Sequence, residues 1–178
     1  MDTIAAQTSP LPSPLDTSPR VLHVPRGAGE QLWVVGDTYT YKVTASETGG
    51  RLFAWEAEIP PDAGPPPHIH HAQLEAYYVL DGELTVIEGE RTLTASAGDF
   101  VYIPPGAVHA FRNTSTRPAR MLIWMSPAGF EDFFREVGTP AIPGQQAPAL
   151  SGEELARTQA AAPRFGLELR LPATELRR

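Results

Sequence analysis

The chain has 178 residues, a formal net charge of −7, no cysteine and one lysine, Lys42. This length is expected to form one domain with a sizeable core. The acidic balance argues against a nucleic-acid partner, because there is no basic stripe to neutralise phosphates. The missing cysteines exclude disulfides and thiolate metal sites.

The N-terminal stretch predicts a flexible arm. Residues 1–20 are rich in Pro, Ser and Thr and show neither the basic start nor the apolar run of a secretory signal. No apolar run along the sequence is long enough to cross a bilayer, so we expect a cytoplasmic protein without a membrane partner. His23, just beyond the arm, is expected at the surface or on an edge strand.

A series of short runs rich in β-branched and aromatic residues follows. Gly, Pro, Asp and Asn separate the runs, as is typical of turns. Nine closely spaced strands predict an antiparallel sandwich or barrel, an all-β fold class. The runs are QLWVVGD, TYTYKVTA, RLFAWEAEI, LEAYYVL, ELTVIEG, RTLTA, DFVYI, VHAFRN and ARMLIWMS.

The first convincing helix is expected after the last strand. In GFEDFFREVG (129–138) the aromatic residues share one helical face, and Gly138 ends the helix. We expect this face to pack on the outer surface of the barrel, although it could also line a ligand pocket. Ser151 with Glu154 reads as a capping box for a helix over 152–161. The alternating tail FGLELRLPA predicts an edge strand, on this chain or on a partner. We therefore divide the chain into an arm (1–20), a barrel with its following helix (21–138) and a linker, helix and tail (139–178).

Three histidines and a glutamate stand close together in GPPPHIHHAQLEAYYVLDG (64–82). His68 and His70 are two residues apart, so both rings project from one face of a strand, whereas His71 should face away. A turn through residues 71–74 would bring Glu75 to the same interior. The turn Pro104-Pro105-Gly106 places His109 near a strand start as a candidate fourth ligand. Such a site suits one divalent ion of Fe, Mn, Ni, Co or Zn.

The two stretches together resemble the cupin superfamily. His68, His70, Glu75 and Gly82 satisfy its first motif, HxH, three or four residues, Glu, six residues, Gly. Its second motif is satisfied at every position, by Gly98, Pro104, Gly106, His109 and Asn113. One departure is that Gly64 precedes the first histidine by a spacer of three prolines where the family usually has five residues, which affects the entry turn and not the ligands.

The resemblance implies a double-stranded β-helix, or jelly roll, with His68, His70, Glu75 and His109 on one metal. The helix after the barrel looks like that of quercetin 2,3-dioxygenase-like cupins. That likeness implies an oxygen-dependent enzyme acting on an aromatic or enolisable hydroxy-ketone, with Glu75 taking the hydroxyl proton, and a homodimer. Alternatives are a non-catalytic cupin that binds a small molecule, and a metal-dependent isomerase or decarboxylase. Candidate pocket residues are Tyr77, Val79 and Phe111, by their parity with the ligands, and Phe53, Trp55, Tyr102 and Trp124.

Overall fold

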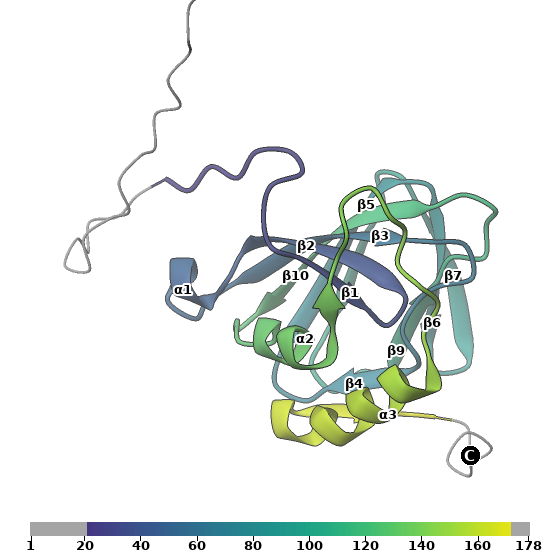
Figure 1. Cartoon of the computed structure of the whole chain (residues 1–178). Coiled ribbons are helices and arrows are strands. Elements are labelled where there is room, and N and C mark those ends of the chain that lie inside the picture. Colours follow the sequence, from purple (N-terminus) through teal and green to yellow (C-terminus); the bar gives the residue numbers. More distant parts are fainter. Residues whose placement is uncertain (1–20, 172–178) are drawn as a thin grey trace, which may run out of the picture.

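The computed structural model describes residues 21–171, and the expected arm over 1–20 lies outside them. Two antiparallel sheets form the two layers of a jelly roll (Figure 1), which confirms the predicted all-β fold class. The larger sheet runs in the order β11 (Thr139–Pro140), β1 (Gln31–Val34), β2 (Asp37–Val43), β3 (Phe53–Ile59), β10 (Ala119–Ser126), β5 (Leu74–Asp81) and β8 (Phe100–Ile103). The smaller runs β12 (Leu167–Leu169), β4 (His68–His70), β9 (His109–Arg112), β6 (Glu83–Glu88) and β7 (Arg91–Ser96).

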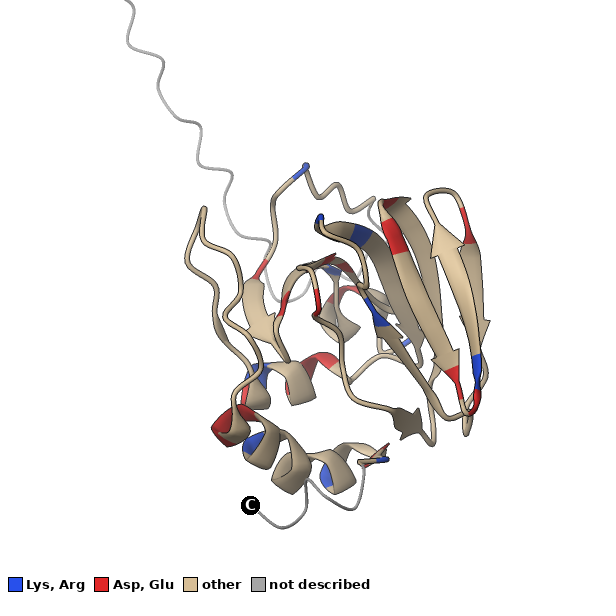
Figure 2. Ribbon diagram, turned by 90° about the vertical axis from the view of Figure 1, so that its right-hand side faces the viewer, with Lys and Arg blue, Asp and Glu red and all other residues tan. Residues whose placement is uncertain are grey.

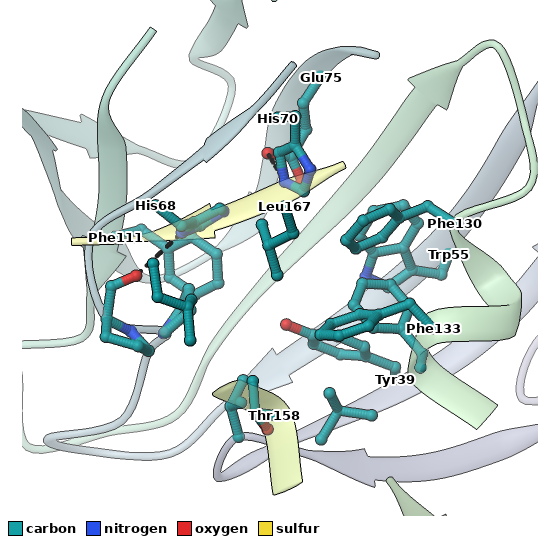
Figure 3. Close-up of a pocket in the computed structure, with 16 residues that line it drawn as sticks. Tyr39, Trp55, His68, His70, Glu75, Phe111, Phe130, Phe133, Thr158 and Leu167 are labelled. Atoms are coloured by element: carbon teal, nitrogen blue, oxygen red, sulfur yellow. Dashed lines mark hydrogen bonds and ion pairs between the residues drawn. The ribbon is translucent and has the colours of Figure 1, made fainter. Parts of the chain in front are cut away.

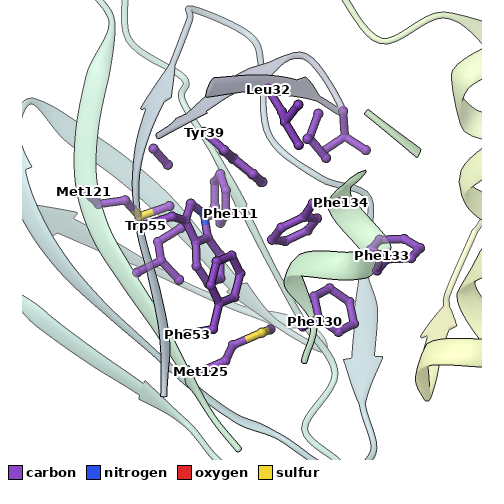
Figure 4. Packing of buried hydrophobic residues seen from close by; sticks show 14 of the residues in the cluster. Leu32, Tyr39, Phe53, Trp55, Phe111, Met121, Met125, Phe130, Phe133 and Phe134 are labelled. Carbon is purple, nitrogen blue, oxygen red and sulfur yellow. The ribbon is translucent and has the colours of Figure 1, made fainter. Parts of the chain in front are cut away.

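Each of the nine predicted runs contains a strand, because alternating side chains fix which face of each run is buried. In β10, Met121, Ile123 and Met125 are fully buried while the residues between them are half-buried. Within the core, Trp55 stacks on Phe53 with ring centroids 4.5 Å apart (Figure 4). The core lies between the two sheets and so forms the floor beneath the histidines of β4 and β9.

The helix after the last strand, α2 (Glu131–Val137), ends at Gly138 as predicted. The expectation that its aromatic face packs on the outer surface is wrong. Phe134 packs edge-on against Trp55 at 5.2 Å, and Phe130 meets the His70 ring at 4.6 Å. Glu131 explains the difference, because its carboxylate accepts hydrogen bonds from the backbone N–H groups of Ala45 and Gly129 and so ties the helix start across the barrel end.

The C-terminal segment returns to both sheets. α3 (Gly152–Ala161) has the predicted bounds, and Ser151 Oγ accepts a hydrogen bond from Glu154 N. The reciprocal half of the capping box is replaced, since Glu154 Oε1 accepts from Val35 N at 2.7 Å instead. After a 3₁₀ turn (Ala162–Phe165), β12 pairs with β4 of the same chain. Of the two alternatives expected for the tail, an edge strand on this chain or on a partner, the structure has the first. The remaining helix is the single turn α1 (Ala45–Thr48).

Charged residues of both signs alternate over the sheets and helices. Figure 2 shows Lys and Arg interspersed with Asp and Glu along the ribbon. Ion pairs such as Arg120 with Glu56 and Arg135 with Glu30 neutralise part of the basic charge. Among residues 21–171, no helix has the length and apolar character that crossing a membrane requires.

Candidate metal centre

Two adjacent strands of the smaller sheet and the start of β5 bring the four candidate ligands together. His68 of β4 lies directly opposite His109 of β9. His70 projects from the same face as His68, and a bend after His70 turns the chain into β5, where Glu75 enters the interior. All four side chains are buried, and one ligand atom from each lies within 4.8 Å of the others.

Backbone carbonyls fix the orientation of two of the rings. His68 Nδ1 lies 2.9 Å from Pro66 O, and His109 Nδ1 lies 3.0 Å from Ala107 O. Because a carbonyl only accepts, both Nδ1 atoms carry hydrogen, and the Nε2 atoms are left to face the cluster. Such outer contacts set the tautomer and angle of metal-binding histidines in general.

The metal-free cluster holds an ion pair. Glu75 Oε2 lies 2.9 Å from His109 Nε2 and 3.8 Å from His70 Nε2, and it accepts a hydrogen bond from the Tyr77 hydroxyl at 3.1 Å. Burial alone would raise the pKa of Glu75, but the hydrogen bond from His109 and the neighbouring imidazoles lower it to about 2. Burial alone would lower the pKa of His109, and the same contact with Glu75 raises it.

The other two histidines are held neutral. Burial, chiefly, lowers the pKa of His70 to about 4 and that of His68 well below its ordinary value. Neutral imidazole is the form that donates a lone pair to a metal. His70 Nδ1 is buried and makes no hydrogen bond within residues 21–171. Three imidazole nitrogens and a carboxylate oxygen therefore fit a divalent transition ion, and the set suits Fe, Mn, Ni, Co or Zn.

A small, mostly apolar cavity of about 40 Å³ adjoins the cluster (Figure 3). His68, His70 and Glu75 lie in its wall together with two of the predicted pocket residues, Trp55 and Phe111. Other lining residues come from outside the two motifs. They are the aromatic residues Tyr39, Phe130, Phe133 and Phe134, and Thr158, Leu167 and Leu169 of the C-terminal segment. The sequence signal for the α2 residues was their shared helical face, which we assigned to the wrong surface.

Five predicted pocket residues lie elsewhere. Tyr77 is buried beside the cavity, where it donates to Glu75, and Phe53 lies behind Trp55 in the core. Val79 points inward but packs at the far end of the barrel, in a separate cluster with Val86 and Ala95.

Tyr102 and Trp124 face outward. The cross-strand row Ala54, Trp124, Ala76 and Tyr102 lies on the outer face of the larger sheet. Tyr102 is 56% exposed as a result, so we correct the prediction that these two residues line the pocket. His71 also faces away, as expected, and pairs with Glu168 at the surface. His23 is exposed, which confirms its expected surface position.

Comparisons with known proteins show what the stretch around this cluster is similar to. Residues 55–125 match the family described as "Cupin domain". Quercetin 2,3-dioxygenase of Bacillus subtilis is 27% identical over 114 residues, which cover 64% of this chain and 34% of that enzyme. The chain thus spans about a third of that relative. The oxalate-binding protein of Thermotoga maritima is 27% identical over 106 residues, 60% of this chain and 84% of the relative.

A solved structure supports the fold. The crystal structure of a protein described as a predicted oxalate decarboxylase from Thermotoga maritima superposes with a TM-score of 0.56 at 17% sequence identity. The superposition covers 60% of this chain and 99% of that chain. The superposition therefore takes in nearly all of that chain, and the remaining part of this chain lies beyond it.

Proposed function

We propose that this chain, whose residues 55–125 match the cupin family, is a metal-dependent dioxygenase acting on an aromatic or enolisable hydroxy-ketone. The observation that carries the proposal is the buried cluster of three histidines and Glu75 at the wall of an aromatic cavity. His68, His70, Glu75 and His109 would hold one divalent ion. Bound there, the ion would act as a Lewis acid that lowers the pKa of a substrate hydroxyl.

Glu75 is the proposed base. Its carboxylate lies in the cavity wall and is ionised in the metal-free protein, where Tyr77 and His109 donate hydrogen bonds to Oε2. A carboxylate within hydrogen-bond reach of a bound hydroxyl can take its proton, which leaves an electron-rich anion able to react with dioxygen. Tyr77 would keep the carboxylate in place during that transfer.

The aromatic wall would exclude water from the reacting anion. Phe130 contacts the His70 ring, and Phe111 packs on Tyr77 with centroids 5.6 Å apart. Both therefore cover the cluster with apolar surface. Removing water strengthens the electrostatic interactions inside a site and limits hydrolytic side reactions.

The test begins with metal content. Protein purified without added metal should contain close to one Fe, Mn, Ni or Co per chain, and His109→Ala should lose it. The matched control is His71→Ala, because His71 is a neighbouring histidine outside the cluster. Oxygen uptake is then measured over hydroxy-ketones and phenols graded in size up to flavonols, with Glu75→Gln alongside. We expect Glu75→Gln to lower uptake by roughly 100-fold or more. Equal uptake by wild type and Glu75→Gln across the panel would refute the proposal.

A second candidate is a non-catalytic cupin that binds a small molecule. Two observations favour it: the cavity of about 40 Å³ has the scale of a very small ligand, and the match to the oxalate-binding protein covers 84% of that relative. Calorimetric titration of metal-loaded protein with oxalate tests it. Tight binding without oxygen uptake or any product would favour this candidate, whereas a product formed without oxygen would indicate an isomerase or decarboxylase.

A further inference from the structure

Two buried polar side chains in the cavity wall have no partner. Trp55 is 1% exposed and Thr158 is 2% exposed. Neither Trp55 Nε1 nor Thr158 Oγ1 makes a hydrogen bond with any residue of the described chain. Buried polar atoms are nearly always hydrogen-bonded in native proteins, so each exception calls for a water molecule or a ligand.

These unpaired atoms gather around one cavity. Within residues 21–171, six buried side-chain nitrogen or oxygen atoms lack a partner, and three of them belong to cavity residues: Trp55, Thr158 and His70. His70 belongs to the metal cluster, whereas Trp55 lies on β3 and Thr158 on α3. Figure 3 shows these side chains around the same space, with the Tyr39 hydroxyl pointing into it. That hydroxyl has only a long hydrogen bond of 3.5 Å, to Asp37.

The rest of the wall is apolar. Phe130, Phe133 and Leu167 line the cavity without offering a polar side-chain atom. Besides the metal cluster, the polar side-chain groups of the wall are thus the Tyr39 hydroxyl, Trp55 Nε1 and Thr158 Oγ1. Its volume of about 40 Å³ has room for roughly three water molecules.

We propose that Trp55 Nε1 and Thr158 Oγ1 bind a second oxygen of the ligand, remote from the oxygens that reach the metal cluster. This inference rests on the metal centre of the proposed function and adds the ligand class. An indole N–H only donates, and a hydroxyl donates or accepts, so the pair fits a neutral hydroxyl or carbonyl oxygen and not an ammonium group. The ligand is thus a two-ended oxygen compound with an apolar middle.

The C-terminal segment supplies half of this subsite. Thr158 lies outside the matched cupin stretch, on α3, where the neighbouring Arg157 donates two hydrogen bonds to Val137 O at 2.9 and 2.8 Å. Because the cavity is smaller than an aromatic ring, a ring-sized ligand must displace part of the wall. Leu167 lies on a three-residue edge strand that pairs with β4, so this part of the wall could move to admit such a ligand.

The experiment compares two probes of equal size. Zinc-loaded protein avoids redox turnover and is titrated with catechol, 4-ethylcatechol and 4-(hydroxymethyl)catechol by calorimetry. The last two differ only by a methyl group in place of a hydroxyl. We expect wild type to bind the hydroxymethyl compound about tenfold more tightly, the effect of one good hydrogen bond. Thr158→Val should reduce the preference to less than twofold, Thr158→Ser should retain it, and catechol itself should bind both variants as it binds wild type.

A second measurement on the wild type does not depend on the variants. The chain has three tryptophans, so its indole N–H resonances are readily assigned by nuclear magnetic resonance. The Trp55 resonance should move downfield with the hydroxymethyl compound and less with the ethyl compound. Trp124, on the outer face, serves as the unaffected control.

Three results would overturn the inference: equal affinity of wild type for the two substituted catechols, a preference that survives Thr158→Val, or no binding of any of the three. Failure of the dioxygenase proposal looks different. A preserved preference without oxygen uptake under any metal would leave the subsite standing and remove the reaction. Oxygen uptake with no preference between the two substituted catechols would support the reaction and overturn the subsite.

Discussion

Glu131 offers the sharpest test of how the barrel end is built. It is 2% exposed, and its carboxylate accepts hydrogen bonds from Ala45 N at 2.6 Å and Gly129 N at 2.7 Å. A hydrogen bond to a charged group contributes about 1.5–3 kcal/mol. Both donor N–H groups are only partly buried, so water would replace part of the hydrogen bonding that Glu131→Ala removes. We therefore expect the free energy of unfolding to fall by about 3 kcal/mol, toward the low end of the sum for two such bonds.

Urea unfolding of the metal-free protein measures this change. Glu131→Gln keeps one carbonyl acceptor and should lose roughly half as much stability. The control is Glu136→Ala, on the same helix, where the ion pair with Arg164 is at the surface and should contribute less than about 1 kcal/mol. If Glu131→Ala lowered stability no more than Glu136→Ala, the two backbone contacts would not hold α2, and another interaction would have to place Phe130 and Phe134 at the cavity.

Three further predictions follow from the same geometry. The metal-free protein should lose stability as pH falls from about 6.5 toward 4, because burial lowers the pKa of His70 to about 4 and the unfolded chain takes up that proton first. The loss from His70 alone is about 3 kcal/mol of unfolding free energy at low pH, and the raised pKa of His109 partly opposes it. Urea unfolding at a series of pH values measures the change. Gly64→Ala should lower the melting temperature and the metal affinity, since a Cβ would lie 2.2 Å from Phe111 O on the strand of His109, whereas Gly152→Ala meets open space and should change neither. The expected homodimer should bury the exposed aromatic patch around Phe100, so Phe100→Glu should yield monomers by light scattering; an unchanged mass would place the contact elsewhere.

The four cluster residues were predictable because local rules position them. Alternation along a strand places His68 and His70 on one face, and the bend that follows brings Glu75 back to the interior. His109 follows a Pro-Pro-Gly turn only a few residues away. In each case the deciding geometry is contained in a short stretch of sequence.

The cavity wall was less predictable because pairing between distant strands decides it. Aromatic composition made Trp55 and Trp124 equal candidates, yet Trp55 pairs with Ile123 on the inner face and Trp124 shares the outer row with Tyr102. The helical period of α2 likewise predicted an apolar face, but it could not predict the surface against which that face packs. That surface depends on the bonds of Glu131 to Ala45, which lies 86 residues earlier in the chain.

The metal centre lies within one stretch of the chain, whereas part of the cavity wall comes from outside that stretch. The matched cupin stretch, 55–125, contains all four cluster residues, whereas Tyr39, Phe130 and Thr158 come from before and after it. β12 pairs with β4, the strand that carries His68 and His70. A ligand that displaces β12 would therefore also shift the backbone of β4. The residues that select the ligand should accordingly be sought not only in the matched stretch but also in β2, α2 and α3, which lie outside it.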